Sequence, residues 1–257
     1  PLGPSATVEV PVLGRGGVPA AGVAAVVLNI TVVQPSEVSY VTVYPGGTQR
    51  PGTSNVNVVP AVTTANSVIV GVGQGRVQLY QHAGNAHLLV DVMGWFPDGA
   101  AFNALIPQRL LDTRPGAPTS DGQGQGGGRV SGPGTASVVV NGRGGVPLTG
   151  VGAVAVNITA AAPSAAGYVS VYPSGGQRPL ASTLNVHPGE TAANMTIVPI
   201  GADGRITLFL DGGSSDFVVD VLGWFAPSDA HTALVPARLA DTRPGAATVD
   251  GSFLGAG

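Results

Sequence analysis

Short runs of β-branched and aromatic residues follow one another along the chain, each bounded by glycine, proline, asparagine or serine. Such runs are typical of β-strands separated by turns. The run from Ala24 to Leu28 is apolar at every position and indicates a central strand, whereas 40–44 and 77–80 alternate and predict strands with one wet face. No segment combines a helical apolar stripe with capping residues. In the first half of the chain the pattern predicts strands at Val8–Val12, Val23–Val33, Val38–Tyr44, Val56–Val59, Ser67–Val72, Arg76–Tyr80 and Leu88–Met93.

The same pattern occurs twice. The motif Gly-Arg-Gly-Gly-Val-Pro begins at Gly14 and again at Gly142, and Asp-Val-x-Gly-Trp-Phe begins at Asp91 and again at Asp220, so the offset is 128 or 129 residues. This period is too long for a solenoid repeat and matches a whole domain. We therefore predict an all-β fold of two tandem antiparallel β-sandwich domains, of jelly-roll or Greek-key type, at 1–128 and 129–257. The join has little apolar surface, so the two copies should touch over a modest area.

The join itself, at about 116–135, is rich in glycine and has the composition of a linker or of a long loop. If it is a linker, the strand that contains Arg109–Arg114 closes the first domain. If it is a loop, that strand opens the second domain, and its copy at Arg238–Arg243 begins a third. A long hinge beside a transferable strand also permits strand exchange between neighbouring copies.

Composition excludes several classes of function. Only 10% of the 257 residues are charged, and 11 arginines, with no lysine, face 14 acidic residues. Both halves are slightly acidic, so we do not expect a nucleic-acid partner. The absence of cysteine excludes disulfides and thiolate chemistry, and no apolar stretch approaches the roughly 20 residues of a membrane span.

Several motifs between Val154 and Arg243 carry a resemblance: Val-Ala-Val-Asn-Ile-Thr, Gly-Tyr-Val-Ser-Val-Tyr-Pro-Ser-Gly, Val-Asp-Val-Leu-Gly-Trp-Phe and Arg-Leu-Ala-Asp-Thr-Arg. Together they resemble a tandem β-domain of secreted, multidomain actinobacterial cell-surface proteins, and the likeness covers essentially the whole chain. The resemblance implies a secreted or cell-surface protein that serves as an accessory module, with no activity established for the family. The first copy departs from the pattern at 71–75, which lacks the proline and aspartate of 198–204.

Charged residues near the Asp-Thr-Arg motif predict an ion-pair network. Asp91 shares a strand face with Leu89 and Trp95, and a partly buried carboxylate needs a partner. The nearby arginines are the candidates, in a structural network or, alternatively, a ligand-facing site. The residues concerned are Asp91, Arg109, Asp112 and Arg114 in the first copy and Asp220, Arg238, Asp241 and Arg243 in the second.

Catalytic chemistry has little support. The four histidines do not recur at matched positions, and neither a Gly-x-Ser-x-Gly elbow nor a His-Glu-x-x-His motif is present, so we expect no enzyme and keep a hydrolase only as a residual alternative. The glycines after Gly14 predict a turn rather than a phosphate cradle. Calcium ligation by Asp203, Asp211 or Asp216 is a weak signal, and we expect no metal and no cofactor.

Two matched loops are the better candidates for binding. Each combines a rigid proline frame with an amide and a guanidinium, which suits polar recognition. Aromatic residues nearby could stack on sugar rings or could equally belong to the core. The candidate ligand-binding residues are Tyr44, Gln49 and Arg50 in one loop and Tyr172, Gln177 and Arg178 in the other. The sequence thus predicts a non-catalytic module for a polysaccharide or other cell-surface polymer, or alternatively a structural spacer that associates with copies of itself.

Overall fold

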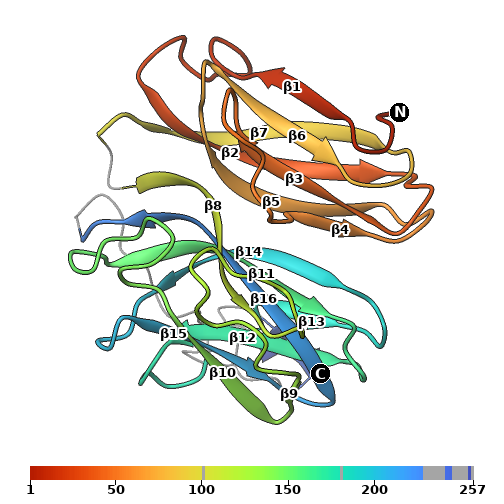
Figure 1. Ribbon diagram of the computed structural model, residues 1–257, viewed down its shortest axis with the longest axis vertical. Coiled ribbons are helices and arrows are strands. Elements are labelled where there is room, and N and C mark those ends of the chain that lie inside the picture. The colour runs from red at the N-terminus through yellow and green to blue at the C-terminus, as the bar shows by residue number, and fades with distance from the viewer. Residues whose placement is uncertain (100–101, 180–181, 228–240, 245–253, 256–257) are drawn as a thin grey trace.

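The computed structural model describes residues 1–99, 102–179, 182–227, 241–244 and 254–255, and these residues form β-strands and turns without a helix (Figure 1). Most of the strands are antiparallel and lie in four sheets, two in each half of the chain. The prediction of an all-β fold with antiparallel β-sandwiches is confirmed.

In the first unit a four-stranded sheet with the order β1-β6-β3-β4 faces a three-stranded sheet with the order β5-β2-β7. Valine and leucine side chains from both sheets, such as Val41, Val43 and Leu79, fill the space between them. β2 is the central strand of its sheet, as its uniformly apolar sequence predicts. The strands are β1 (Thr7–Pro11), β2 (Val23–Val33), β3 (Ser39–Pro45), β4 (Val56–Val58), β5 (Thr64–Gly71), β6 (Arg76–Gln81) and β7 (His87–Pro97).

The second unit repeats this plan, with sheets ordered β10-β15-β12-β13 and β14-β11-β16-β8, and with β9 paired to one end of β16. The strands are β8 (Phe102–Asp112), β9 (Val130–Ser131), β10 (Gly134–Val139), β11 (Ala153–Ala161), β12 (Gly167–Pro173), β13 (Leu184–Val186), β14 (Ala192–Pro199), β15 (Arg205–Leu210) and β16 (Ser214–Phe225). A short parallel pair, β17 (Asp241–Pro244) and β18 (Leu254–Gly255), follows.

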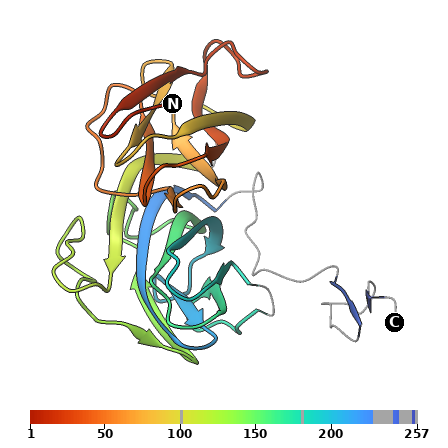
Figure 2. The ribbon, with the colours of Figure 1, turned by 90° about the vertical axis from the view of Figure 1, so that its right-hand side faces the viewer.

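Strand β8 belongs to the second unit. It follows β7 in the chain, yet it pairs with β16 and not with β7, and Figure 2 shows it running beside β16. The second unit therefore begins near residue 102, not at residue 129 as the repeat boundaries suggested. Strand pairing shows this, whereas sequence periodicity fixes only the length of the repeat.

The glycine-rich join is a folded loop of the second unit. The amide of Asp112 donates to the carbonyl of Gly124 at 3.0 Å, and the amide of Gly126 donates back to the carbonyl of Asp112 at 2.8 Å. Arg143, only 6% exposed, holds the loop by hydrogen bonds to Asp121 at 2.7 and 2.8 Å. The structure therefore shows that this stretch is a loop and not a linker.

The two units pack closely. The core cluster of the first unit includes Phe102, Leu222 and Phe225 from the second, and the ring of Phe96 lies 4.8 Å from that of Phe102 between centroids. The expectation of a small contact between independent cores is therefore wrong. Ala153 and Ala155 of β11 belong to the same cluster, so apolar side chains of the second unit's β14-β11-β16-β8 sheet pack against the first unit.

Candidate functional site

In the first unit, the candidate loop between β3 and β4 places an arginine over an aromatic ring. Gln49 and Arg50 are exposed, and the guanidinium carbon of Arg50 lies 3.9 Å from the ring centroid of Tyr80 on β6. This distance is well inside the range of a cation–π contact. We call Arg50, Tyr80 and the neighbouring Tyr40 the first platform; it lies on the sheet face opposite the core residues.

The second unit has the same arrangement. Gln177 and Arg178 are exposed, and the guanidinium carbon of Arg178 lies 4.0 Å from the ring centroid of Phe209 on β15. Tyr168 stands 6.2 Å from the Phe209 ring between centroids. Arg178, Phe209 and Tyr168 form the second platform, and the loop residue and its ring correspond to those of the first unit.

His82 extends the first platform only. Its exposed ring stacks on Tyr40 with centroids 4.4 Å apart and an interplanar angle of 15°. Asp211 occupies the equivalent position in the second unit. The sequence repeat places an aromatic residue at the matched positions Tyr80 and Phe209, which is a signal that sequence reasoning could have used. Their contact with the loop arginines depends on the fold.

The two loop tyrosines are not available to a ligand. Tyr44 is 4% exposed and Tyr172 is 8% exposed. The chain after Tyr44 folds back along the sheet, where the hydroxyl of Thr42 donates to the carbonyl of Thr53 at 2.6 Å. Tyr44 and Tyr172 therefore act as structural residues beneath the loops, and the candidate ligand contacts reduce to the amides and guanidiniums.

The ion-pair network is present in the second unit. Nε of Arg109 donates to Asp220 at 2.9 Å, Nη1 of Arg109 to Asp112 at 3.1 Å, and Nη2 of Arg114 to Asp112 at 2.6 Å. The carboxylates of Asp220 and Asp112 are 1% and 0% exposed. Burial raises the pKa of Asp220, against the opposing effect of Arg109. The hydrogen bond with Asp112 raises the pKa of Arg114.

Asp91, the equivalent of Asp220, does not take part in such a network. It is exposed on β7, and its carboxylate has no ion pair within the described ranges. Of the arginines expected to hold it, Arg109 and Arg114 bond to Asp112 and Asp220 instead. The reason is topological, because β16 has β8 along its side whereas β7 pairs, within the described ranges, with β2 alone. Arg238 lies outside the described residues, and the side chains of Asp241 and Arg243 are not described.

A buried polar junction, which sequence reasoning missed, joins the units. The amide of Asn66 donates to Asn157 at 3.0 Å, and Asn157 donates to the carbonyl of Ser54 at 2.8 Å. Both asparagines are buried. Since buried amides need partners, this junction fixes how the two units face each other.

Beside this junction a cleft of about 380 Å³ lies between the first candidate loop and the second unit. It brings Pro51, next to Arg50, close to Arg109 of the ion-pair network. The guanidinium of Arg109 is already bonded to two carboxylates, so it offers a ligand little unsatisfied charge. The nine lining residues are Pro51, Gly52, Thr53, Pro107, Gln108, Arg109, Pro118, Thr119 and Ser120.

The weak calcium signal finds no support. Asp203 lies 3.9 Å from Arg205 and Asp216 lies 3.3 Å from Arg129, measured between charged atoms. No group of three or more metal-ligating side chains gathers anywhere in the part of the chain that the structure describes. The structure also contains, within that part, no helix long and apolar enough to cross a membrane.

Comparison with protein-family models and with curated proteins found no match to this chain.

Proposed function

We propose that the chain is a non-catalytic, secreted or cell-surface module that binds a surface polymer through its two arginine-aromatic platforms. The observation that carries the proposal is the duplication of the platform, since Arg50 on Tyr80 and Arg178 on Phe209 repeat the same contact at 3.9 and 4.0 Å. A duplicated site on a repeated module suits a ligand that is itself repetitive.

The chemistry of the platforms indicates the class of polymer. Neither Arg50 nor Arg178 forms an ion pair with any residue in the described ranges, so each guanidinium is available to a carboxylate or a hydroxyl of a ligand. Half-buried Tyr168 in the second platform, and the exposed ring of His82 stacked on Tyr40 in the first, are aromatic groups of the kind on which sugars stack. A polysaccharide with acidic groups meets both requirements.

The platform arginines provide the test. The double variant Arg50→Ala, Arg178→Ala should lose at least about tenfold in retention on insoluble cell-wall polysaccharide or peptidoglycan, because the cationic contacts are removed. Its melting temperature should fall by only a few degrees, since an exposed cation–π contact contributes roughly 0.5–1 kcal/mol.

A matched control is the double variant Arg76→Ala, Arg205→Ala. These arginines are equivalent in the repeat, Arg205 exposed and Arg76 half-buried, and they lie outside the platforms, in ion pairs with Glu9 and Asp203. The control removes the same net charge and should keep its retention. Equal retention of all three proteins would refute binding through the platforms, and equal loss in both double variants would indicate non-specific charge attraction.

A structural spacer is the second candidate function. The close packing of the two units and the buried asparagine junction favour it, because they make the pair of units one rigid rod-like element rather than two tethered binding modules. A parent protein that no polymer retains would leave this reading as the better one.

A further inference from the structure

Strand β7 has an open side. In the second unit the equivalent strand β16 lies between β11 and β8, whereas β7 pairs with β2 alone among the described residues. Leu89, Met93 and Trp95 on β7 are 47%, 56% and 40% exposed. Long apolar edge strands are rare on isolated proteins, because their free amides and carbonyls accept a further strand.

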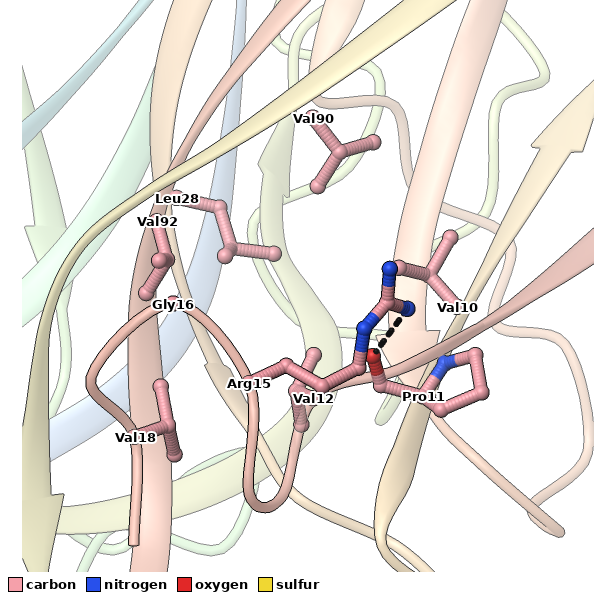
Figure 3. Close-up of a pocket in the computed structure, with 9 residues that line it drawn as sticks. All are labelled: Val10, Pro11, Val12, Arg15, Gly16, Val18, Leu28, Val90 and Val92. Atoms are coloured by element: carbon pink, nitrogen blue, oxygen red, sulfur yellow. Dashed lines mark hydrogen bonds between the residues drawn. The ribbon is translucent and has the colours of Figure 1, made fainter.

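An apolar pocket of about 180 Å³ lies beside this open edge (Figure 3). In the second unit the equivalent place is filled by Leu110 of β8, which is fully buried, and a Cβ on Gly144 would stand 2.8 Å from its side chain. At Gly16, the equivalent of Gly144, the one described neighbour of such a Cβ is a methyl group of Val92, at 2.7 Å. The hydrophobic residues that line the pocket are Val10, Pro11, Val12, Val18, Leu28, Val90 and Val92.

Polar groups around the pocket also lack the partners that their equivalents have. Arg143 donates to the carbonyl of Leu110 at 2.8 Å and to Asp121 at 2.7 Å, both in β8 or its following loop. Its equivalent, Arg15, is exposed, and its guanidinium donates to the carbonyl of Pro11 at 3.0 Å and to no other group in the described part of the chain (Figure 3). Asp91 likewise has no arginine partner among the residues that the structure describes, whereas its equivalent Asp220 receives Arg109 from β8.

Glycines on the two strands show the same contrast. A Cβ at Gly223 on β16 would overlap the ring of Phe102, which β8 lays across that glycine. At Gly94 on β7 the nearest atom to a Cβ is a methyl of Val27 at 4.0 Å, which is ordinary contact. Among the described residues, the first unit thus has an apolar pocket, a cation and a carboxylate without an ion pair, and an uncovered glycine at the places that β8 occupies in the second.

The sequence of this chain contains one further β8-like segment, at 231–250. It repeats 102–121 so that Arg238, Leu239 and Asp250 stand where Arg109, Leu110 and Asp121 stand in the first. Asp241, within the segment, pairs in parallel with Leu254, which lies beyond it. This pair matches the parallel bridge between Asp112 and Gln125 at an offset of 129 residues. The loop that follows β8 thus has a counterpart.

We infer that the 231–250 segment of a second copy of this chain adds to the open edge of β7 as β8 adds to β16. In that complex Leu239 fills the apolar pocket, Arg238 pairs with Asp91, and Asp250 pairs with Arg15. The pocket, Asp91 and Arg15 thereby receive the same residue types that their equivalents contact in the second unit.

A second copy is the expected donor because of the order of the strands. β8 leaves the first unit directly after β7 and pairs in the next unit, and the 231–250 segment follows β16 in the sequence as β8 follows β7. If the 231–250 segment crosses as β8 does, it reaches a unit that lies beyond the second one, which is not the first unit of the same chain. The contact is therefore head to tail and leaves a free end on each copy, so the association is open-ended.

Exposed groups on the acceptor side allow a test without loss of folding. The double variant Arg15→Ala, Asp91→Ala should shift the full chain from oligomers to monomers in sedimentation velocity over a concentration series, with the apparent dissociation constant raised at least about tenfold. Glu37→Ala, which also removes an exposed charge but lies away from β7, should leave the oligomers unchanged.

The donor side provides an independent test. A chain ending at residue 227 retains every residue of the two core clusters and should be monomeric. It should bind a labelled peptide of residues 228–257, and the peptide variant Leu239→Asp should bind at least about tenfold more weakly. The peptide variant Val249→Ser, which introduces the serine found at the equivalent exposed position Ser120, is the matched control and should bind as the parent.

Two results would overturn the inference. One is a peptide that does not bind the shortened chain, which would leave the edge of β7 without this partner. The other is a full chain that stays monomeric at all concentrations and does not bind the added peptide, although the shortened chain binds it. That result would mean that the chain's own 231–250 segment occupies the edge of β7.

Discussion

Removal of the charge of Arg109 should lower the free energy of unfolding, because it leaves the buried carboxylate of Asp220 without its ion-pair partner. Arg109 is the only cation within ion-pair distance of Asp220 among the described residues, and Asp220 is 1% exposed. Asp112 keeps its bond to Arg114 at 2.6 Å and so retains a partner. The variant Arg109→Met, which preserves most of the side-chain volume, therefore leaves one unpaired buried charge and should lower the free energy of unfolding by about 3–5 kcal/mol at pH 7.

The loss should depend on pH with a definite sign. Burial raises the pKa of Asp220, and removal of Arg109 takes away the charge that opposes this rise. A carboxyl with a raised pKa in the folded state takes up a proton on folding, so acidification favours the folded form. The difference between variant and parent should therefore be largest near pH 7 and shrink toward pH 5, by at most about 1.4 kcal/mol per pH unit.

Urea unfolding followed by tryptophan fluorescence, at both pH values, measures the difference. Asp91→Asn is the control, since the exposed equivalent carboxylate has no described ion pair, and it should change stability by less than about 0.5 kcal/mol in monomeric protein. A loss below about 1 kcal/mol for Arg109→Met, or one that does not change with pH, would refute the reasoning.

Three further predictions concern the same contrast between the units and the join between them. Gly223→Ala should cost about 1–3 kcal/mol in thermal unfolding because the added methyl group overlaps the ring that covers β16, whereas Gly94→Ala should be nearly neutral in the monomer. Asn157→Ala should cost about 1–3 kcal/mol in urea unfolding, because a buried amide at the junction loses its partner. The pKa of Asp121 is lowered to about 2 by its hydrogen bond from Arg143. The carboxylate therefore contributes fully to folding stability above its ordinary pKa near 3.8, and this contribution is lost as the pH falls toward 2. The loss of unfolding free energy in Asp121→Asn, measured against pH, should disappear over that range.

Most strands of the first unit could be predicted from the sequence. The predicted run Val23–Val33 is the observed β2, and the other predicted strands differ from the observed ones by a few residues at their ends. This agreement has a local cause, since alternation of apolar side chains and the turn residues between them determine where an extended chain begins and ends. β8 was longer than its motif suggested, since it begins at Phe102.

The candidate sites were less accessible to sequence reasoning. The exposed positions of Arg50 and Arg178 follow from their proline- and glycine-rich loops, but the rings beneath them are some 30 residues away and meet them only across neighbouring strands. The same limitation applies to Asn66 and Asn157, which lie 91 residues apart. Contacts of this kind depend on which strand faces which, and local patterns do not record that.

The sequence by itself determined the class of fold, the length of the repeat and the turn positions, because these depend on the chemistry of adjacent residues. Only the tertiary structure decided to which unit β8 belongs and hence why Asp220 is paired while Asp91 is exposed. The physical reason is that β7 and β16 carry the same Asp-Val-x-Gly-Trp-Phe motif, so local residue patterns do not distinguish their edges. Which edge β8 covers depends on the crossing of the chain between units, a property of topology rather than of residue type.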